Sequence, residues 1–395
     1  MNKPLTIASD AHLATLESKL PHVGTTIFTV MSALAVEKGA VNLGQGFPDF
    51  DCDPKLIDAV TAAMKSGLNQ YPPMAGVPAL REAIAAKLEK IYGHKYDAAT
   101  EITVTAGATQ ALLTAILCIV HAGDEVIIIE PVYDSYVPAI ELAGGKPVPV
   151  QMTMGAEGYS VPWDRVAAAV TPRTRLIMIN SPHNPTGSVL HEADMRALED
   201  IVRGTNILIV SDEVYEHMVY DGARHESVCR YPELAGRSFV VSSFGKTYHV
   251  TGWKIGYVAA PAPLAAEFRK VHQFNVFTVN TPVQHGIATY MADPVPYLDL
   301  PLFYQRKRDL FRDGLKNTRF RLLPSDGTYF QCVDYSAISD MPETEFAKWL
   351  TTEIGVAAIP VSAFYNEPKE SGIVRFCYAK KDDTLRLALE RLTKV

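Results

Sequence analysis

The feature that most constrains the fold is a series of short apolar runs that alternate with helical patterns through the middle of the chain. The runs are rich in Val, Ile and Leu, as expected for strands that are covered on both faces of a sheet. They predict seven strands, at residues 102–105, 125–130, 146–151, 174–180, 207–210, 239–242 and 254–259. Helical patterns lie between them, notably at 109–120 and 193–202. This alternation predicts an α/β fold with a mostly parallel, seven-stranded sheet covered by helices.

The sequence changes character on either side of this block. A helical pattern covers residues 27–36 and a Gly- and Pro-rich stretch follows at 42–48, whereas a charged helical pattern occupies 303–316. With 395 residues, the chain is also longer than one hydrophobic core usually serves. We therefore predict a large domain at residues 50–290 and a smaller α+β domain formed by residues 1–49 and 291–395.

Charge, cysteine content and hydropathy argue against several classes of protein. The chain has 37 Lys and Arg against 44 Asp and Glu, and this net charge of −7 argues against nucleic acid as a partner. Its five cysteines form no CxxC pair, which favours a reduced, cytoplasmic compartment. Residues 1–20 contain no signal-peptide core. The uncharged stretch at 102–123 divides into a strand, a turn and a helix capped by Thr109, which is too short to span a membrane.

Small and polar residues follow the predicted strands, at the edge where parallel α/β sheets bind their ligands. Ala106-Gly107-Ala108-Thr109 follows the first strand and opens a helix. Free N–H groups and small side chains at such a position can hold a phosphate group. The same residues also suit a tight strand-to-helix turn, and the segment alone does not decide between the two.

Two further strands end in residues that suggest chemistry. The loop at 180–187 contains two prolines and a glycine that fix the position of Asn184, although Asn-Pro is also a common turn. Asp212 follows a wholly apolar strand, where an unpaired carboxylate is costly to bury. It therefore requires a cation, a metal or a protonated ring nitrogen as its partner. No ligand-type spacing of His or Asp lies nearby, so we predict no metal.

Lys246 is the candidate nucleophile. It follows the strand at 239–242, and Gly245-Lys246-Thr247 is similar to the end of a P-loop. Val240 stands where a P-loop requires glycine, which excludes nucleotide binding. A partly desolvated lysine at a strand end has a lowered pKa and can form a Schiff base, unless its side chain simply reaches solvent. GxGxxG, GxSxG and HExxH patterns do not occur, so dinucleotide, α/β-hydrolase and zinc-protease functions have no support.

Four motifs combine in one order along the chain. They are Asn184-Pro185-Thr186-Gly187, Asp212-Glu213-Val214-Tyr215, Ser243-Phe244-Gly245-Lys246 and Arg375. This set resembles the class I/II aminotransferases of fold type I, which depend on pyridoxal 5'-phosphate (PLP) and share the aspartate aminotransferase-like fold. The resemblance covers almost the whole chain, and within the family it points to the kynurenine, glutamine and methionine aminotransferase group.

The resemblance implies a ping-pong transamination between an amino acid of the methionine, glutamine or aromatic (kynurenine) class and a 2-oxo acid. Lys246 would form the Schiff base with PLP and then shuttle the α-proton of the substrate. Asp212 would keep the pyridine nitrogen protonated. Tyr215 and Asn184 would hydrogen-bond the ring oxygen of the cofactor, and Tyr133 would stack on its ring.

The resemblance also implies a phosphate site and a dimer. The residues that would hold the phosphate are Gly107, Ala108, Thr109, Ser243 and Lys254. Lys254 stands where many relatives have arginine, and a lysine still supplies a positive charge for a phosphate. Tyr71 would reach the phosphate of a partner chain, so we expect a homodimer with shared active sites.

Substrate binding follows from the same resemblance. Arg375 would clamp the α-carboxylate bidentately, with help from Gly44 and Asn184. The walls around the substrate side chain would be Phe28, Tyr133, Phe277 and Phe364, of which we expect Phe364 to be ordinary core packing. Val361 stands where relatives often have glycine, so we assign no role to its loop.

Two other functions remain open at this point. A β-lyase that acts on cysteine conjugates or cystathionine would use the same cofactor, the same lysine and the same proton abstraction. A PLP-binding transcription regulator would carry a helix-turn-helix module, for which a chain of this length leaves no room. No second arginine is evident for a side-chain carboxylate, so the sequence favours uncharged amino donors.

Overall fold

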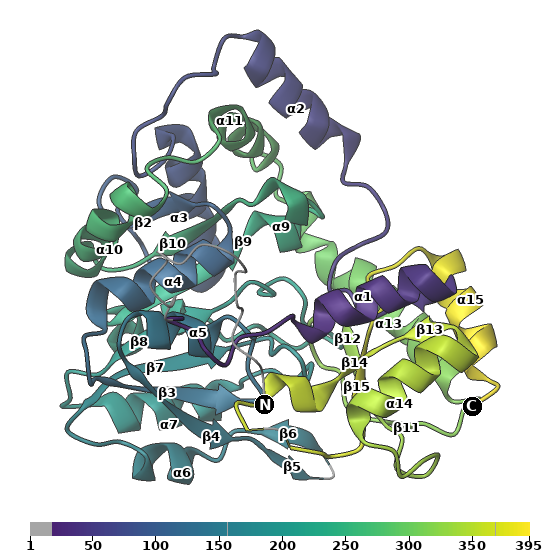
Figure 1. The fold of residues 1–395 in the computed structure, drawn as a ribbon. Coiled ribbons are helices and arrows are strands. Elements are labelled where there is room, and N and C mark those ends of the chain that lie inside the picture. The colour runs from purple at the N-terminus through teal and green to yellow at the C-terminus, as the bar shows by residue number, and fades with distance from the viewer. Residues whose placement is uncertain (1–17, 156, 368) are drawn as a thin grey trace, which may run out of the picture.

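The structure of the protein, a computed structural model, describes residues 18–155, 157–367 and 369–395 (Figure 1). At its centre lies a seven-stranded sheet with the strand order β2-β10-β9-β8-β7-β3-β4. Its strands are β2 (Ile102–Thr105), β3 (Glu125–Glu130), β4 (Lys146–Gln151), β7 (Thr174–Asn180), β8 (Leu208–Asp212), β9 (Ser238–Ser243) and β10 (Gly256–Ala259). Only β10 runs antiparallel to its neighbours. The predicted α/β fold with a mostly parallel, seven-stranded sheet is confirmed.

Both faces of this sheet are buried, which explains the continuous apolar runs. Val126 and Ile128 on β3 share a hydrophobic cluster with α4 (Ala108–Ile119), α5 (Tyr136–Leu142) and α10 (Ala262–Asn275). Ile127 and Ile129 belong to the opposite cluster, with α3 (Pro78–Tyr92), α6 (Trp163–Ala168) and α7 (Glu192–Val202). Successive side chains of a strand point to opposite faces, so a strand between two helical layers needs apolar residues at every position.

Two boundaries at the edge of the sheet differ from the sequence prediction. Helix α4 begins at Ala108 and its N-cap is Gly107, so the expected cap at Thr109 is wrong. Gly107 has a φ of 80°, a left-handed value that favours glycine and turns the chain directly from β2 into the helix. Strand β10 begins at Gly256 rather than at 254, because a 3-10 turn at Thr251–Trp253 and a left-handed Lys254 precede it.

A second, antiparallel sheet carries the C-terminal part of the chain and lies beside the first (Figure 1). Its order is β11-β12-β15-β14, with β11 (Arg321–Leu322), β12 (Phe330–Asp334), β14 (Ile359–Pro360) and β15 (Ile373–Cys377). Helices α13 (Leu300–Leu315), α14 (Glu343–Trp349) and α15 (Asp382–Leu392) contribute to its hydrophobic core. Helix α13 starts at Leu300 rather than at 303, because a proline near its start is compatible with a first helical turn.

The N-terminal segment joins this C-terminal part. Helix α1 (Ile27–Lys38), predicted at 27–36, packs against the core of the second sheet, and β1 (Val41–Asn42) pairs in parallel with β13 (Val356–Ala357). The chain then leaves for the large sheet, where α2 (Pro54–Lys65) packs on α11 (Thr281–Tyr290) at the top of Figure 1. Residues 1–17, which the prediction assigns to the smaller domain, lie outside the described residues.

The remaining elements are short. They are the hairpin of β5 (Thr153–Gly155) and β6 (Gly158–Ser160), and the helices α8 (Pro232–Ala235), α9 (Phe244–Thr247) and α12 (Val295–Leu298). None of the helices that the structure describes is long and apolar enough to cross a membrane. Within the same residues, no three His, Cys, Asp or Glu side chains are grouped so that they could hold a metal ion.

Candidate active site

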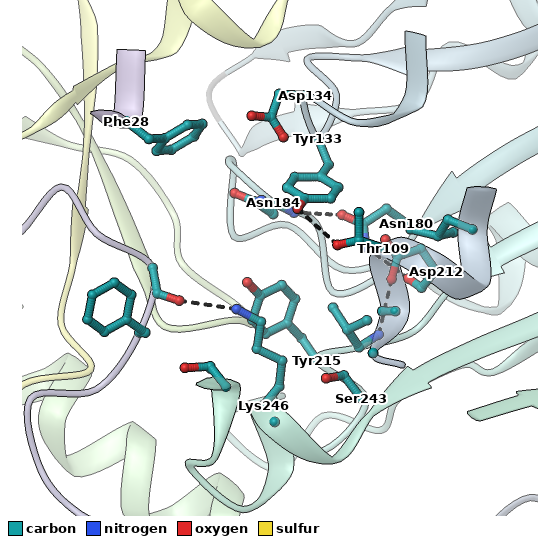
Figure 2. Close-up of a pocket in the computed structure, with 18 of the residues that line it drawn as sticks. Phe28, Thr109, Tyr133, Asp134, Asn180, Asn184, Asp212, Tyr215, Ser243 and Lys246 are labelled. Atoms are coloured by element: carbon teal, nitrogen blue, oxygen red, sulfur yellow. Dashed lines mark hydrogen bonds between the residues drawn. The ribbon is translucent and has the colours of Figure 1, made fainter. Parts of the chain in front are cut away.

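A cavity of about 340 Å³ opens between the carboxyl ends of the large-sheet strands and the second sheet (Figure 2). Parallel α/β sheets bind their ligands at this edge, so the cavity lies where the sequence predicted the chemistry. The predicted site residues that line it are Phe28, Gly107, Ala108, Thr109, Tyr133, Asn184, Asp212, Tyr215, Ser243, Lys246, Lys254 and Arg375. The fold thus brings residues from both ends and from the middle of the chain to one place.

One corner of the cavity is built to receive an anion. The first N–H groups of α4 have no partner within the helix, and the helix dipole adds positive potential at this end. A Cβ atom at Gly107 would lie 3.4 Å from the Nζ of Lys254, so glycine leaves the space beside that ammonium free. Ser243, the last residue of β9, also lines this cavity. The Tyr133 hydroxyl lies 3.3 Å from the Thr109 Oγ1, which holds its ring beside the start of α4 (Figure 2).

Asp212 is the buried carboxylate of the site. It ends β8, and its Oδ2 accepts a 2.7 Å hydrogen bond from the hydroxyl of Tyr136. The backbone N–H of Val214 donates to its Oδ1 at 3.3 Å. Burial raises the pKa of Asp212 to about 6, while these hydrogen bonds and the charge of Lys246 favour the ionised form. Tyr136 was missed from the sequence, because its contact with Asp212 spans 76 positions of the chain.

Lys246 lies on α9, directly after β9, and points into the cavity (Figure 2). Its Nζ donates to the carbonyl of Gly46 at 3.1 Å and to the hydroxyl of Tyr329 at 2.8 Å. Burial lowers the pKa of Lys246 to about 8, because removal from water disfavours the ammonium form. The ring of Tyr215 lies 5.4 Å from the same Nζ, and burial raises the pKa of this tyrosine above its usual value. Tyr329 was not identified from the sequence.

Arg375 provides a buried cation on β15, with an exposed fraction of 1%. Its Nη1 donates to the Oδ1 of Asn184 at 2.6 Å and its Nη2 to the carbonyl of Gly44 at 3.0 Å. Its Nε has no hydrogen-bond partner among the residues that the structure describes. The guanidinium lies against aromatic rings, 3.9 Å from the ring centre of Phe330 and 4.9 Å from that of Phe364. Burial lowers the pKa of Arg375, and the group remains a cation at neutral pH.

Gly44 and Phe364 therefore contact Arg375 and do not line the cavity. Gly44 holds the guanidinium through its carbonyl, and Phe364 is buried against it, in agreement with the core packing expected for this ring. Asn184 is fixed in turn by Asn180, whose Oδ1 accepts from the Asn184 N–H at 2.8 Å. The Nδ2 of Asn180 donates to the carbonyl of Asp212, also at 2.8 Å. Hydrogen bonds through Asn184 and Asn180 thus connect Arg375 with the backbone of Asp212 at the end of β8.

Tyr71 and Phe277 lie outside the cavity of their own chain. Their rings contact each other at 5.2 Å on the surface, where Tyr71 is 81% exposed and Phe277 is 47% exposed. Within its own chain, Phe277 therefore does not form a wall of the cavity. The reason is local, because α10 ends at Asn275 and a left-handed turn at Phe277 directs the ring to the surface.

Besides Tyr136 and Tyr329, which contact residues of the cavity, sequence reasoning missed residues that line it, among them Asp134 and Phe330. Asp134 lines it, with the carboxylate turned toward the side on which Phe28 lies (Figure 2). Partial burial raises the pKa of Asp134, and the charge of Arg375 works against that shift. Phe330, the first residue of β12, is a further wall. Asp134 follows the predicted Tyr133 in the chain, so its position was the available signal, whereas nothing in the local sequence marks Phe330.

Comparison with known proteins agrees with this geometry. The family of class I and II aminotransferases matches residues 38–392. The methionine aminotransferase of Escherichia coli (strain K12) is 51% identical over 380 residues, which cover 96% of this chain and 98% of that protein. Human kynurenine–oxoglutarate transaminase 1 is 34% identical over 394 residues, which cover 91% of this chain and 93% of that protein.

Solved structures give the same result. YbdL from Escherichia coli, identified as a methionine aminotransferase, has a TM-score of 0.94 at 50% identity and covers 97% of this chain and 100% of its own. N-succinyldiaminopimelate aminotransferase from Mycobacterium tuberculosis has a TM-score of 0.93 at 42% identity, with coverages of 96% and 99%. These relatives are transaminases, so a lyase function is not favoured. The chain belongs to the class I and II aminotransferase family and is a PLP-dependent aminotransferase of fold type I.

Proposed function

We propose that this enzyme transfers the amino group of methionine, or of a glutamine or aromatic amino acid, to a 2-oxo acid in a ping-pong reaction, with Lys246 as the residue that carries PLP. The observation on which the proposal depends is that one cavity combines a lysine with a lowered pKa, a buried carboxylate and a buried arginine. Transamination needs all three, since it must bind a carboxylate, move a proton and support a charged cofactor ring.

The residues of the cavity fit PLP. The N-terminus of α4, the open space at Gly107 and the Nζ of Lys254 suit its phosphate, and Ser243 completes this corner. Asp212 suits a protonated ring nitrogen, because a buried carboxylate with a raised pKa is stabilised by a cation beside it. When bound, PLP supplies an electron sink that stabilises the charge left on the substrate after deprotonation.

Lys246 is the proposed base. With a pKa of about 8, a substantial fraction of its Nζ is unprotonated near neutral pH, whereas an ordinary lysine is almost entirely an ammonium. The Nζ then accepts the proton from the substrate Cα and later returns it. Asp212 remains ionised when a positive charge lies beside it, and the Tyr136 hydroxyl holds its carboxylate in one orientation.

Arg375 is the proposed partner of the substrate α-carboxylate. Asn184 and Gly44 fix its guanidinium, while the Nε–H is not used by any described residue. The remaining walls include the rings of Phe28, Tyr133 and Phe330, which suit a thioether or aromatic side chain. Among the residues that the structure describes, the cations that line the cavity are Lys246, Lys254 and Arg375. All three have proposed roles, so none of these remains for a second carboxylate. The 51% identity to a methionine aminotransferase supports the same donor class.

We also infer a homodimer whose two sites are shared. Tyr71 and Phe277 present adjacent, exposed rings that no part of their own chain covers among the described residues. In such a dimer, Tyr71 and Phe277 of one chain would lie near the N-terminus of α4 in the partner chain, where the phosphate is proposed to bind. We infer in addition that residues 50–290 form one domain and that residues 1–49 with 291–395 form the other, which is supported by the pairing of β1 with β13.

The function is tested on the purified holoenzyme. Borohydride reduction and peptide mass spectrometry should locate the pyridoxyl group on Lys246, and a screen of donors and acceptors should show methionine well above aspartate and glutamate. Lys246→Ala should lower kcat/KM at least about a thousandfold. Lys316→Ala, at an exposed lysine on the surface, is the matched control and should leave it unchanged. A pyridoxyl group on another lysine would contradict the proposal, and pyruvate and ammonia released without an acceptor would favour the β-lyase.

The shared site is tested by mixing two inactive variants. Tyr71→Ala and Lys246→Ala each impair both sites of a homodimer, but a hybrid of the two has one site with Lys246 and with Tyr71 from the partner. Unfolding and refolding the two variants together should therefore restore up to about a quarter of the wild-type activity, since half of the dimers are hybrids with one intact site. Hybrids that form but remain inactive would exclude a shared site.

A further inference from the structure

The free amine of Lys246 is held from two sides by groups that lie far from it in the sequence. Its Nζ donates to the Gly46 carbonyl at 3.1 Å, drawn as a dashed line in Figure 2, and to the Tyr329 hydroxyl at 2.8 Å. The Tyr329 hydroxyl itself donates to the Gly46 carbonyl at 2.5 Å. These three groups form a closed triangle of hydrogen bonds. It connects Lys246 on α9 with Gly46 in the N-terminal segment and with Tyr329, the residue before β12.

These hydrogen bonds determine the orientation of the lone pair on the Nζ of Lys246. A neutral amine has two N–H bonds and one lone pair, and both N–H bonds have acceptors in Gly46 and Tyr329. The lone pair is then directed away from these two residues, toward the cavity that Lys246 lines. An ammonium would carry a third N–H, for which the described residues offer no further acceptor. The two acceptors also stabilise the ammonium, but they leave the neutral amine with one direction for its lone pair, toward the cavity.

Tyr329 is fixed in this position by its surroundings. It is 1% exposed, and its ring contacts those of Tyr215 at 5.2 Å and Tyr304 at 5.6 Å. The preceding Thr328 has a φ of 64°, and its carbonyl accepts hydrogen bonds from the hydroxyls of Tyr220 and Tyr378. Burial raises the pKa of Tyr329 well above its usual value, so its hydroxyl remains a neutral group at physiological pH.

We propose that Tyr329 is a positioning residue for proton transfer, which together with the Gly46 carbonyl holds the free Nζ of Lys246 with its lone pair facing the substrate α-carbon. This inference rests on the proposed role of Lys246 as the base. It adds a residue from the second sheet to the catalytic apparatus. Because Gly46 belongs to the N-terminal segment, the amine is held only when that segment and the second sheet both lie against the large sheet.

The test compares two tyrosines that differ only in whether the hydroxyl is used. Tyr329→Phe removes the acceptor and keeps the ring. Tyr304→Phe is the matched control, because Tyr304 contacts Tyr329 and its hydroxyl has no hydrogen-bond partner among the described residues. Both changes leave every charge near Lys246 intact. The titratable and charged groups around its Nζ are Asp212, Tyr215, Lys254, Tyr329, Arg375 and Cys377.

The first measurement needs no cofactor. The cofactor-free protein is treated with cyanate over a range of pH, and carbamylation of Lys246 is followed by peptide mass spectrometry. In Tyr329→Phe, the midpoint of this reaction should move to lower pH by about one pH unit, because an acceptor that stabilises the ammonium is lost. Tyr304→Phe should retain the wild-type midpoint.

The second measurement uses the holoenzyme with methionine and with α-deuterated methionine. Tyr329→Phe should lower kcat about tenfold, with KM little changed, and should increase the deuterium isotope effect on kcat as proton transfer becomes slower. Wild-type titration and an unchanged isotope effect in Tyr329→Phe would overturn the inference, as would the same loss in Tyr304→Phe, which would indicate a packing defect. If the wild type itself carries no pyridoxyl group on Lys246, the proposed function fails first, and the inference fails with it.

Discussion

At the scale of single residues, Asp134 is the side chain of the cavity with the clearest consequence for substrate choice. Its carboxylate faces the cavity near Phe28, and no cation pairs with it within 4 Å among the described residues (Figure 2). The charge of Arg375 works to lower the pKa of Asp134, and in the proposed binding mode this arginine pairs with the substrate α-carboxylate. A second carboxylate on the substrate would then meet a like charge and no free cation.

We therefore predict that Asp134→Asn improves the use of dicarboxylic substrates. The ratio of kcat/KM for glutamate to kcat/KM for methionine should rise about tenfold. This is the effect expected when the repulsion between the Asp134 carboxylate and a nearby substrate carboxylate is removed in partly solvent-screened surroundings. Asp164→Asn, at an exposed position on α6, is the control and should leave the ratio unchanged. Steady-state kinetics with both donors check the prediction, and an unchanged ratio in Asp134→Asn would show that the charge does not reach the substrate side chain.

The residues that could be predicted from the sequence are those that a strand end places in the site. Lys246 and Asp212 each follow an apolar run, and general rules for parallel sheets locate such residues at the ligand edge. Tyr136 contacts Asp212 and Tyr329 contacts Lys246, and these partners are separated by 76 and 83 positions of the sequence. No local sequence pattern encodes contacts between residues so far apart. Phe277 illustrates the reverse, since an aromatic residue expected in the cavity lies on the surface.

At the scale of elements, the helix α3 and the strands β9 and β10 are joined by a buried network of polar side chains. Glu216, just beyond β8, accepts hydrogen bonds from Lys87 on α3 at 2.5 Å and from Ser242 on β9 at 2.6 Å. Tyr92 and Tyr257 donate to the same carboxylate at 2.5 Å and 3.2 Å. Ser242 lies next to the end of β9 and four positions before Lys246, so the network fixes the strand end that precedes the lysine.

A charge-removing substitution in this network should be strongly destabilising. Lys87→Met leaves the Glu216 carboxylate buried without its cation, at a cost of about 3 kcal/mol in the free energy of unfolding. Lys90→Met lies on the exposed face of the same helix and should change stability by less than about 0.5 kcal/mol. Chemical denaturation at a fixed protein concentration measures both, and a double variant with Glu216→Gln should recover part of the loss. Equal effects at positions 87 and 90 would contradict the proposed importance of the pair.

The same helix shows why element-level prediction has a limit. The segment that forms α3 contains two lysines, Lys87 and Lys90, and lysines are usually solvent-exposed. Lys87 is 6% exposed because its partner arrives from a loop more than a hundred residues away. The direction of β10 was unpredictable for a related reason, since an apolar run indicates a buried strand but not which way it runs.

At the scale of the whole molecule, the two-part arrangement was accessible from the sequence because a change in composition marks it. The continuous apolar runs stop where the charged pattern of α13 begins, and the second sheet follows. Its strands were not predicted individually, since β11 and β14 contain only two residues each and are too short to show a periodicity. The contact between the two sheets, and with it the complete cavity, depends on tertiary packing that no segment encodes alone.

Four histidines contribute to the pH dependence of stability, of which His183, His217 and His272 are buried and His249 is partly buried. Burial lowers the pKa of His183, His249 and His272 to about 4 and that of His217 to about 3. An unfolded chain binds protons at these residues near the ordinary value of about 6.5. Between about pH 4 and pH 6.5 the unfolded state therefore binds more protons than the folded state, so stability must fall as the pH falls through this window. Asp212, whose pKa burial raises to about 6, works in the opposite direction, and so do Glu130, Asp134 and Asp326, whose pKa values burial also raises.

We accordingly predict that the Tm and the free energy of unfolding decrease when the pH is lowered from 7.5 to 5.5. His272→Gln removes one of the four groups and should reduce that decrease by about 1 kcal/mol, because a histidine kept neutral in the folded state contributes about this much at one pH unit below its unfolded pKa. His121→Gln is the matched control, since the side chain of His121 is 78% exposed. Denaturant unfolding of the three proteins at both pH values measures the effect. A pH dependence that His272→Gln leaves unaltered, or that His121→Gln alters as much, would show that the buried histidines are not its cause.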